Sequence, residues 1–446
     1  MAQVLRLATK TQEDSFDFLT GTLRPQNMTR MPNGDGWYTT SMMLVGRGSD
    51  SDILYAADYL DNNMANTCDL FWSDTHQTKS VWLEESATSE TTKRSLVKSI
   101  ELQPVQDGWF SPLLNKKGAF YQLTIIHSAV WEGVAEKNFS GENTNCLGGT
   151  ILVAAPNGSM SGRVEYAAIF GDANSTTDIS TLWGGIRPHD TTASDTDFNP
   201  VLELENANRN TGVTVASDSD YASPNGTTDN VLSYVSTSDD YKMCWITLDD
   251  AFASVNYDHW YGDYQVLLRC KLSAANSTRF HVDWGYKYGT YFNSGQLVYV
   301  SSTDYQLYEM GNVSIPPFPR TYSTGLGKYF EFQVYALSMG SAATITLDCL
   351  ILIPSKHYFK ITNAILENSG FSSVTGYISE DNLTRCENVN SSSLVNMAAQ
   401  FAPNNFSVPV AGGIFVIAAQ APAIHYVTDE VYPMIYYYER YRTHAE

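Results

Sequence analysis

The stretch Asp263–Leu272, DYQVLLRCKL, decides the fold class. Apolar side chains occupy alternate positions of it: Tyr264, Val266, Leu268, Cys270 and Leu272. Gln265, Arg269 and Lys271 mostly occupy the positions between them. Successive side chains of a strand point to opposite faces of the sheet, so this period of two predicts a strand with one buried face.

Similar strands recur along the chain. In residues 328–337, KYFEFQVYAL, the side chains of Phe330, Phe332, Val334 and Ala336 oppose those of Tyr329, Glu331, Gln333 and Tyr335. Residues 344–354, TITLDCLILIP, are apolar almost throughout, which is typical of a strand covered on both faces. Turn signals separate the strands, for example Asn-Gly at 157 and 225. The pattern predicts an all-β chain of antiparallel β-sandwiches. The only helices we expect are short ones near Thr92–Ser99 and Ser393–Phe401.

The length of the chain predicts more than one domain. Its 446 residues exceed the roughly 250–300 that one hydrophobic core usually organises. Residues 1–134 are rich in strand patterns, and a polar junction separates them from a second region, 135–355. Residues 356–446 are too short and too rich in loops to own a core. We therefore expect them to complete the N-terminal domain, which makes residues 135–355 an insertion.

Composition excludes several classes of partner. The chain has 27 basic and 48 acidic residues, so its formal charge is 27 − 48 = −21. Such a surface repels phosphate backbones, and no Lys/Arg stripe reverses this, so we expect no nucleic-acid partner. No stretch approaches the roughly 18 apolar residues of a membrane span, and the N-terminus lacks the apolar region of a signal peptide. We expect synthesis in a cytosol-like compartment and no membrane anchor.

No motif points to catalysis, a metal or a cofactor. The Walker, GxGxxG, GxSxG and HExxH patterns are all absent. The six cysteines are scattered, which favours buried thiols over a disulfide or zinc framework. His127 and His281 lie in strand patterns, which favours a structural role for both. His259 differs because acidic and aromatic residues flank it in the sequence, but no nucleophile is placed beside it. Two Asp-rich turns, at Asp50 and Asp52 and at Asp218 and Asp220, could supply oxygen ligands to calcium, but solvated turn aspartates are the simpler interpretation.

Aromatic residues supply two hypotheses about binding. A set beside Gly-containing turns would present flat rings to sugar faces: Trp260, Tyr261, Trp284, Tyr286 and Tyr288. Packing in the core or between subunits is the alternative. The C-terminal stretch VYPMIYYYERYRTHAE is apolar on both strand faces, so it must be covered by its own chain or by another copy. The residues predicted to contact a neighbouring subunit are Tyr432, Tyr436, Tyr437, Tyr438 and Arg440.

The middle of the chain also resembles a known family. GDYQVLLRCKLS, RFHVDWGY, Met310–Pro316 and Leu347–Pro354 follow one another as in the jelly-roll domain, similar to carbohydrate-binding modules, of tail and other virion proteins of tailed bacteriophages. Asp178–Pro188 and the aromatic final strand also resemble such proteins. The resemblance implies a jelly roll inserted in the composite N/C-terminal domain and a location in the virion after synthesis in the host cytoplasm. It transfers no catalytic residue, metal or cofactor.

Three functions therefore compete. The first is a structural component of a tailed-phage virion, in the minor tail, distal tail or baseplate, that assembles as a homo-oligomer with other virion proteins and contacts the host surface. Capsid decoration and a head fibre are variants of this hypothesis. The second is a lectin-like adhesin that binds host-surface polysaccharide through the aromatic turns. The third, a carbohydrate-active hydrolase, needs two carboxylates across a cleft, and no such pair is identifiable in the sequence.

Overall fold

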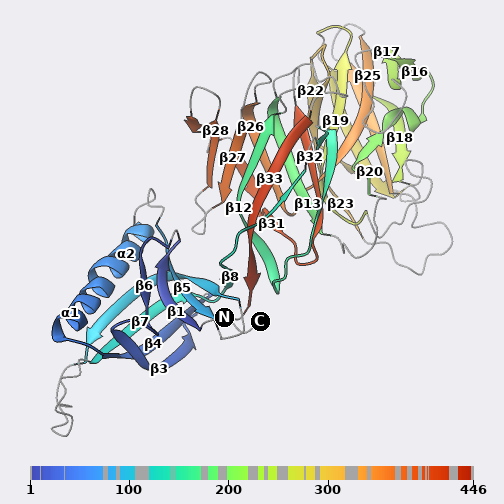
Figure 1. The fold of residues 1–446 in the computed structure, drawn as a ribbon. Coiled ribbons are helices and arrows are strands. Elements are labelled where there is room, and N and C mark those ends of the chain that lie inside the picture. Colours follow the sequence, from blue (N-terminus) through green and yellow to red (C-terminus); the bar gives the residue numbers. More distant parts are fainter. Residues whose placement is uncertain are drawn as a thin grey trace, which may run out of the picture. The chain divides into compact units, whose positions relative to one another are not determined.

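The chain forms an almost entirely β structure, as predicted. The computed structural model describes residues 3–10, 12–34, 36–73, 79–86, 91–105, 120–141, 144–145, 147–171, 179–188, 198–218, 230–235, 240–248, 260–275, 278–286, 292–316, 330–338, 343–366, 373–378, 384–389, 394–396, 399, 401–420 and 430–442. Two compact units divide the chain (Figure 1). Unit 1 comprises Met1–Lys137, Asn157–Gly162 and Tyr438–Glu446, and unit 2 comprises Asn138–Pro156 and Arg163–Tyr437.

Unit 1 consists of antiparallel strands and a helical layer. The strands are β1 (Val4–Thr9), β2 (Ser15–Asp17), β3 (Leu23–Pro32), β4 (Trp37–Gly46), β5 (Val81–Ser86), β6 (Lys93–Pro104), β7 (Phe120–Ser128) and β8 (Trp131–Gly133). They pair in the orders β2-β1-β5-β6-β8 and β3-β4-β7-β6. The long strand β6 therefore belongs to both arrays. The helix predicted at Thr92–Ser99 was wrong, because this segment lies within β6 between two strand partners.

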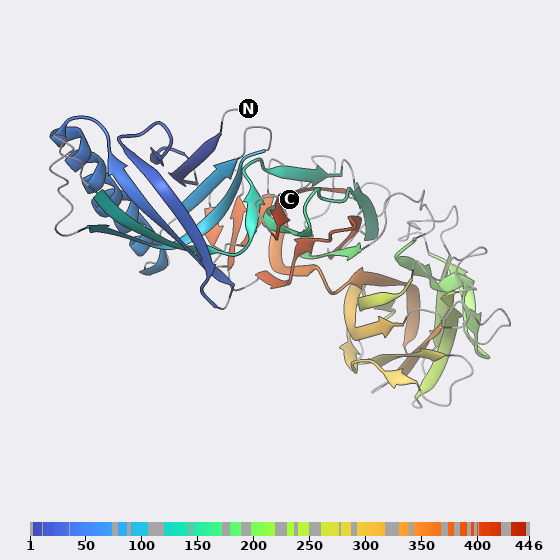
Figure 2. The same ribbon diagram turned by 90° about the horizontal axis from the view of Figure 1, so that it is seen from below.

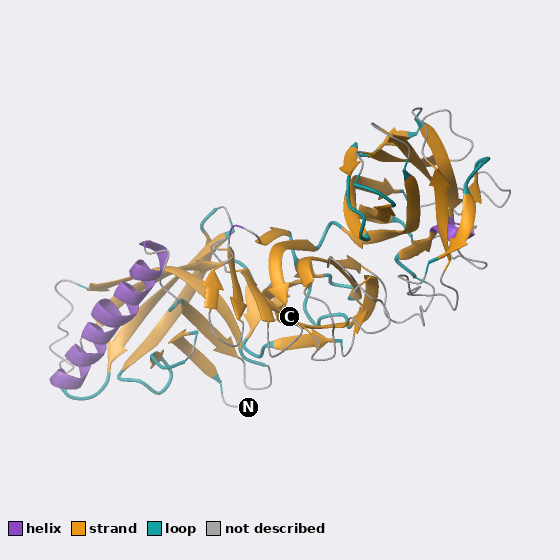
Figure 3. Cartoon of the chain, turned by 90° about the horizontal axis from the view of Figure 1, so that it is seen from above, coloured by secondary structure: helices purple, strands orange, loops and turns teal. Residues whose placement is uncertain are grey.

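The helical layer of unit 1 was missed in the sequence. It consists of α1 (Asp50–Asp58), a π-helical segment η1 (Tyr59–Ala65) and α2 (Asn66–Ser73), and it lies along the strands of unit 1 (Figure 3). Its buried stripe has helical spacing: Ile53, Ala56, Ala57, Leu60, Met64 and Cys68. The exposed apolar side chains of Leu54, Tyr55 and Leu70 blur that period. Ser49 and Asp52 form a capping box, so this Asp-rich turn starts a helix.

The C-terminal strand β33 (Glu430–Tyr441) begins in unit 2 and ends in unit 1. Its last residues pair with β8, Arg440 opposite Glu132 and Tyr441 opposite Trp131. The Glu439 carboxylate accepts hydrogen bonds from the backbone and the side-chain amide of Asn157, at 3.2 and 3.1 Å. The tyrosine-rich terminus is therefore covered, in part, by its own chain.

Unit 2 contains two sandwiches, and the first is discontinuous in sequence. One of its sheets has the order β11 (Leu147–Val153), β32 (Gly413–Gln420), β13 (Ile179–Pro188), β26 (Tyr358–Leu366) and β30 (Phe401–Asn404). The facing strands include β9 (Lys137–Ser140), β12 (Met160–Gly171), β27 (Ser373–Ile378), β28 (Thr384–Val389), β29 (Leu394–Asn396), β31 (Ser407–Val408), β33 and the short β10 (Thr144–Asn145). A core that includes Phe359, Phe415 and Ile435 fills the space between them.

The second sandwich of unit 2, the inserted sandwich (residues 201–354), lies in the chain between β13 and β26. One sheet contains β16 (Thr214–Ser217), β17 (Asn230–Val235), β25 (Thr344–Pro354), β19 (Gly262–Leu272) and β23 (Gln306–Ile315), with β14 (Val201–Glu203) also beside β25. The other contains β15 (Asn208–Arg209), β18 (Tyr241–Thr247), β24 (Phe330–Ser338), β20 (Thr278–Tyr286) and β21 (Asn293–Ser294), with β22 (Val298–Val300) also beside β20. A short η2 (Leu204–Asn206) follows β14. Figure 2 shows the two layers.

The predicted inner faces are confirmed in this sandwich, but the opposite face of β19 is also largely buried, because Leu267 and Arg269 are 0% and 2% exposed. The side chains of Tyr264, Val266, Leu268, Cys270 and Leu272 are at most 1% exposed and lie in its core. On β24 the predicted apolar set also lies in the core. Strand β25 is buried along nearly its whole length, because strands of the first sandwich contact it as well. The period-two pattern therefore identified both the strands and their inner faces.

The strand pairing differs from the expected domain organisation. Residues 358–437 pair mainly with residues 138–188 in unit 2, and only Tyr438–Glu446 return to unit 1. The insertion therefore interrupts a sandwich that begins after the N-terminal unit. The sequence could not show whether the insertion interrupts the N-terminal unit or the sandwich that follows it. Both contain apolar strands, and only the long-range pairing of strands distinguishes them. The predicted boundaries at 134 and 355 lie close to Lys137 and to the end of β25.

The cysteines agree with the expectation where they are described. Cys68, Cys244, Cys270 and Cys349 are buried free thiols. Burial raises the pKa of the Cys68 and Cys244 thiols to about 12, so these groups remain neutral. The helix predicted at Ser393–Phe401 was wrong, because Leu394–Asn396 form β29 and Phe401 begins β30. Among the described residues, no helix has the length and apolar character needed to cross a membrane.

Candidate functional site

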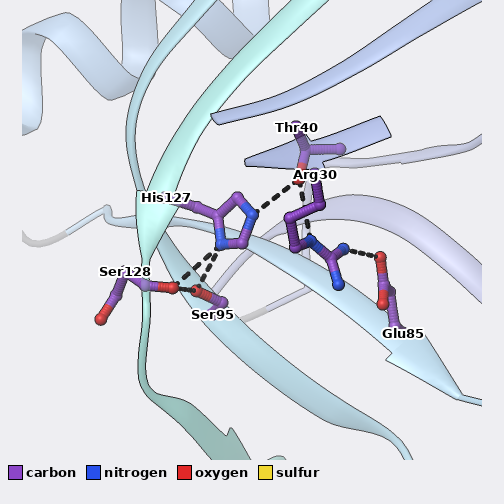
Figure 4. Close-up of polar contacts among 6 residues, drawn as sticks. All are labelled: Arg30, Thr40, Glu85, Ser95, His127 and Ser128. Atoms are coloured by element: carbon purple, nitrogen blue, oxygen red, sulfur yellow. Dashed lines mark hydrogen bonds and ion pairs between the residues drawn. The ribbon is translucent and has the colours of Figure 1, made fainter. Parts of the chain in front are cut away.

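His127, at the end of β7, is the centre of a buried polar chain in unit 1. Its Nε2 lies 2.8 Å from Thr40 Oγ1, and its Nδ1 lies 2.9 Å from Ser95 Oγ and 3.0 Å from the Ser128 carbonyl oxygen. Arg30 Nε donates to Thr40 Oγ1 at 3.0 Å and its guanidinium also pairs with Glu85. Figure 4 shows these residues converging from four neighbouring strands and the end of β7. Both ring nitrogens of His127 and the hydroxyls of Thr40 and Ser95 have partners in this network.

The network assigns the proton of the His127 ring. Ser95 Oγ donates to the Ser128 carbonyl at 2.6 Å, so it accepts from Nδ1–H, and Nε2 accepts from the Thr40 hydroxyl. Burial, together with the charge of Arg30, lowers the pKa of His127 to about 4. A neutral His127 that already donates toward Ser95 cannot act as its general base. His127 is structural, as the sequence indicated.

The outward face of the β18–β24–β20 sheet is the strongest candidate binding surface of the described chain. We call it the β24 face, and its residues are Lys242, Trp245, Arg279, His281, Asp283, Glu331, Gln333 and Tyr335. The strands place them in cross-strand rows. Trp245 is opposite Gln333, which is opposite Asp283, and Lys242 is opposite Tyr335, which is opposite His281. Alternation points these side chains away from the core, which their neighbours fill. Glu331 and Gln333 are nevertheless 4% and 8% exposed, so the partly exposed residues around them form the accessible part of the face.

Hydrogen bonds and stacking order the β24 face. Gln333 Nε2 donates to Glu331 Oε1 at 2.5 Å, and the Tyr335 hydroxyl donates to Gln333 Oε1 at 2.7 Å. The rings of His281 and Tyr335 are stacked with centroids 4.6 Å apart. The ammonium of Lys242 lies 4.8 Å from the centre of the Trp245 ring. Long side chains are thus held in single orientations, which lowers the entropy cost of binding a ligand.

Two groups of the β24 face have unused hydrogen-bonding capacity. Arg279 Nε and Asp283 Oδ1 are inaccessible to solvent and make no hydrogen bond with the described residues. His281 lies 3.7 Å from Asp283 and 4.0 Å from Asp240. A surface of this kind combines aromatic rings with carboxylate, amide and cationic groups, which is the chemistry that recognises sugar hydroxyls.

The aromatic residues predicted for glycan stacking lie in different environments. Trp260 is fully buried and Trp284 is 6% exposed, and both belong to the core of the inserted sandwich. Their rings cannot meet a sugar in this fold, which corrects that part of the prediction. Tyr261 is 47% exposed, with the Arg187 guanidinium 5.7 Å from its ring centre. Tyr286 lies at the end of β20, and Tyr288 and His259 lie outside the described residues.

The tyrosines predicted to contact a neighbouring subunit are also divided. Tyr437 and Tyr438 are buried within the chain. The Arg94 guanidinium lies 4.3 Å from the centre of the Tyr438 ring and at the same distance from the centre of the Trp82 ring. Tyr432, Tyr436 and Arg440 are only partly buried and leave some surface for a partner. Tyr437 and Tyr438 therefore serve internal packing, and intersubunit contact remains a prediction for the other residues.

Asp218 takes part in a charged cluster of the inserted sandwich. Its carboxylate accepts from the Tyr305 hydroxyl at 2.8 Å and pairs with Lys271 at 2.7 Å. Nearby, buried Arg269 pairs with buried Asp348 and lies over the Tyr305 ring. Asp220 lies outside the described residues. Among the described residues, no group of three or more acidic, His or Cys side chains is arranged to hold a metal ion.

Sequence reasoning missed the β24 face, although the signal was visible. The alternation in residues 328–337 separated Glu331, Gln333 and Tyr335 from the apolar set. The sequence places them only on the side opposite the apolar set. Only the pairing of β24 with β18 and β20 brings Trp245, His281 and Asp283 beside them.

Comparisons with known proteins find only weak structural likenesses. No family model matches the chain, and no curated protein matches it. The similar solved structures include TmCBM61 in complex with β-1,4-galactotriose, at 10% identity and a TM-score of 0.21, over 37% of this chain and 94% of that one. Another is the CBM22-1 xylan-binding domain of Paenibacillus barcinonensis Xyn10C, at 16% identity and a TM-score of 0.22, over 38% and 93%.

A third similar structure is the SPP1 Dit (gp 19.1) protein, described as a paradigm of the hub adsorption apparatus in phages that infect Gram-positive bacteria. It has 9% identity and a TM-score of 0.23, over 78% of this chain and 100% of that one. All three TM-scores lie below 0.5, so no functional argument rests on them. The class of the protein is that of antiparallel β-sandwich proteins.

Proposed function

We propose that this chain is a structural component of a tailed-phage virion. Its place is in the minor tail, distal tail or baseplate, where it assembles as a homo-oligomer with other virion proteins. One observation carries the proposal. The segments that resemble the phage jelly-roll domain, β19, β20, β23, β24 and β25, form the two facing sheets of a single inserted sandwich. These strands pair with partners that are distant in the sequence. A chain that resembled the jelly-roll domain only by chance would not be expected to bring all of them into one sandwich.

The polar chemistry of unit 1 supports an architectural role. The Arg30–Thr40–His127–Ser95 chain satisfies its own groups, and the neutral His127 has no nucleophile to activate. Buried Arg94 is held between two aromatic rings. Buried polar networks of this kind make a fold rigid, and a structural subunit of a particle needs a rigid fold. We propose accordingly that the chain is not an enzyme.

Assembly is the direct test of this function. A permanent homo-oligomer buries more than roughly 2,000 Å² per interface. The purified chain should therefore form a closed ring or cluster in light scattering coupled to size-exclusion chromatography and in negative-stain images. Peptides of the chain should also be found by mass spectrometry in purified tailed particles. A chain that is monomeric at all concentrations and absent from particles would contradict the proposal.

Capsid decoration or a head fibre is a variant that antibody labelling distinguishes. Gold particles directed against the chain should lie on the tail or baseplate in electron micrographs. Gold confined to the capsid surface would place the protein in the head instead.

A lectin-like adhesin is the second candidate, and the β24 face is the observation that favours it. Aromatic rings beside carboxylate and amide groups suit an extended polysaccharide, such as one on a host surface. Trp245→Ala should abolish binding to a cell-wall polysaccharide on a glycan array while circular dichroism remains unchanged. Tyr55→Ala is the matched control, because Tyr55 is 72% exposed in unit 1. Equal binding by both variants would exclude the β24 face.

A further inference from the structure

A polar depression of about 490 Å³ lies in unit 2, away from the residues of the β24 face. Four segments line it: the start of β19, the end of β23, the turn between β25 and β26, and the turn between β30 and β31. The lining residues are Asp263, Asn312, Val313, Ser314, Ser355, Lys356, Asn404 and Asn405. Both sandwiches of unit 2 therefore contribute to it.

Backbone hydrogen bonds hold these segments together. The Ser355 N–H donates to the Asp263 carbonyl oxygen at 2.8 Å, which joins the β25–β26 turn to the start of β19. Asn404 Nδ2 donates to the Ser355 carbonyl oxygen at 2.9 Å, which adds the β30–β31 turn. The frame of the depression is thus connected without help from a ligand.

His357 holds the Asn404–Asn405 side of the frame. Its Nδ1 lies 3.2 Å from the Asn405 carbonyl oxygen and 2.9 Å from Ser407 Oγ. Asn405 has a φ of +46°, a left-handed conformation that Asn tolerates better than most residues but that still needs support. His357 is buried, and its own carbonyl accepts from the Ile186 N–H at 2.8 Å. The turn is therefore fixed in an uncommon conformation that directs it toward the depression.

The side chains that line the depression are largely unused by the fold. The Asp263 carboxylate, the Asn312 amide, the Ser314 hydroxyl and the Lys356 ammonium make no hydrogen bond or ion pair with the described residues. One carboxylate and one ammonium cancel in formal charge, although the chain as a whole carries −21. Val313, between Asn312 and Ser314, is 1% exposed and points into the core, so the accessible lining of the depression is polar. A rigid frame with free donors and acceptors and no net charge suits a neutral polar ligand.

We propose that this depression binds a compact saccharide of one or two units. A carboxylate and amide oxygens accept from sugar hydroxyls, and amide and ammonium groups donate to them. The volume falls within the range of roughly 300–1,000 Å³ usual for small-molecule sites. Tyr261, an exposed aromatic residue two positions before Asp263, adds a ring near the start of β19. The proposal stands apart from the virion role and from the β24 face.

Ligand-observed NMR on the full chain tests this site. Saturation-transfer spectra are recorded with glucose, galactose, mannose, N-acetylglucosamine, glucuronate and the disaccharides of the neutral hexoses. At least one neutral sugar should show transfer with a millimolar dissociation constant, as expected for a single shallow subsite. The double variant Asn312→Ala/Lys356→Ala should weaken that affinity by about tenfold or more.

Controls separate this site from the alternatives. Asp263→Asn conserves shape and should weaken binding less than Asn312→Ala/Lys356→Ala does, whereas Asn206→Ala, an exposed position outside the depression, should change nothing. Absence of transfer from every sugar, or full binding by the double variant, would overturn the proposal. Binding of glucuronate alone would also overturn it, because the ligand would then be an anion held by Lys356.

Discussion

The buried polar chain around His127 and the β24 face use similar residues in opposite ways. Around His127 each donor meets an acceptor inside the fold, and the ring is fully buried. On the β24 face Gln333 orders its neighbours, but Arg279 and Asp283 retain atoms without a hydrogen bond to the described residues. The comparison teaches that the network around His127 completes its hydrogen bonds inside the fold, whereas the β24 face leaves two buried atoms without a hydrogen bond to the described residues.

The depression near Asn405 belongs with the β24 face by this criterion. Its frame is complete in hydrogen bonds, yet the side chains that line it are not. Substitutions in networks whose hydrogen bonds are complete should lower the stability of the fold, and substitutions in incomplete networks should weaken the binding of a ligand.

Asp348→Ala should produce the largest loss of stability. It leaves the Arg269 guanidinium, which is 2% exposed, without the carboxylate it pairs with. Breaking a buried pair in this way costs about 3–5 kcal/mol of unfolding free energy. Urea denaturation followed by circular dichroism measures it. The double variant Arg269→Met/Asp348→Leu should recover most of the loss, and a double variant as unstable as Asp348→Ala would contradict the explanation.

Tyr438→Ala should destabilise unit 1 by about 3 kcal/mol. The substitution removes a buried ring and one of the two rings that flank Arg94. Tyr436→Ala, two positions earlier and only partly buried, is the matched control and should cost about 1 kcal/mol. Light scattering of both variants then shows whether the terminus also serves assembly. Equal losses of unfolding free energy for the two variants would show that the difference in burial between Tyr436 and Tyr438 does not determine their contributions to stability.

His127 should make unit 1 less stable in acid. Its pKa is about 4 in the folded chain and about 6.5 when unfolded, so the unfolded state binds more protons between these values. The stabilisation is complete above about pH 6.5, falls as the pH falls and is lost below about pH 4, for a total of about 3 kcal/mol. The measurement is the unfolding free energy of wild type minus that of His127→Gln across this range. A difference that does not change with pH would show that the pKa of His127 is the same in the folded and the unfolded chain.

Trp245→Ala should have the smallest effect on stability, about 1 kcal/mol or less. Trp245 lies on the outward side of β18, where its ring contacts Lys242 but does not fill the core. Thermal unfolding monitored by circular dichroism measures the change. A loss comparable to that of Asp348→Ala would show that the β24 face is part of the packed interior and would remove the distinction drawn above.

Much of the local structure was predictable, and the misses have physical causes. Period-two patterns located β19, β24 and β25 and their buried sides, because alternation is a local property of a strand. The helix at Asp50–Ser73 was missed because its stripe includes small alanines and its outer side carries Leu54 and Tyr55. Trp260 and Trp284 were misassigned because nearby glycines suggested exposed turns, whereas both rings lie in the core.

The sequence by itself determined the fold class and the inner and outer sides of the principal strands, because burial of apolar side chains imposes a period on the chain. Only the tertiary structure decided which strands are neighbours, that residues 358–437 complete the sandwich begun at 138–188, and that Tyr438 packs on Arg94. It also decided both candidate sites, since the β24 face and the depression draw on residues far apart in sequence. Long-range pairing depends on the fit of whole surfaces, and no local pattern in a chain encodes that fit on its own.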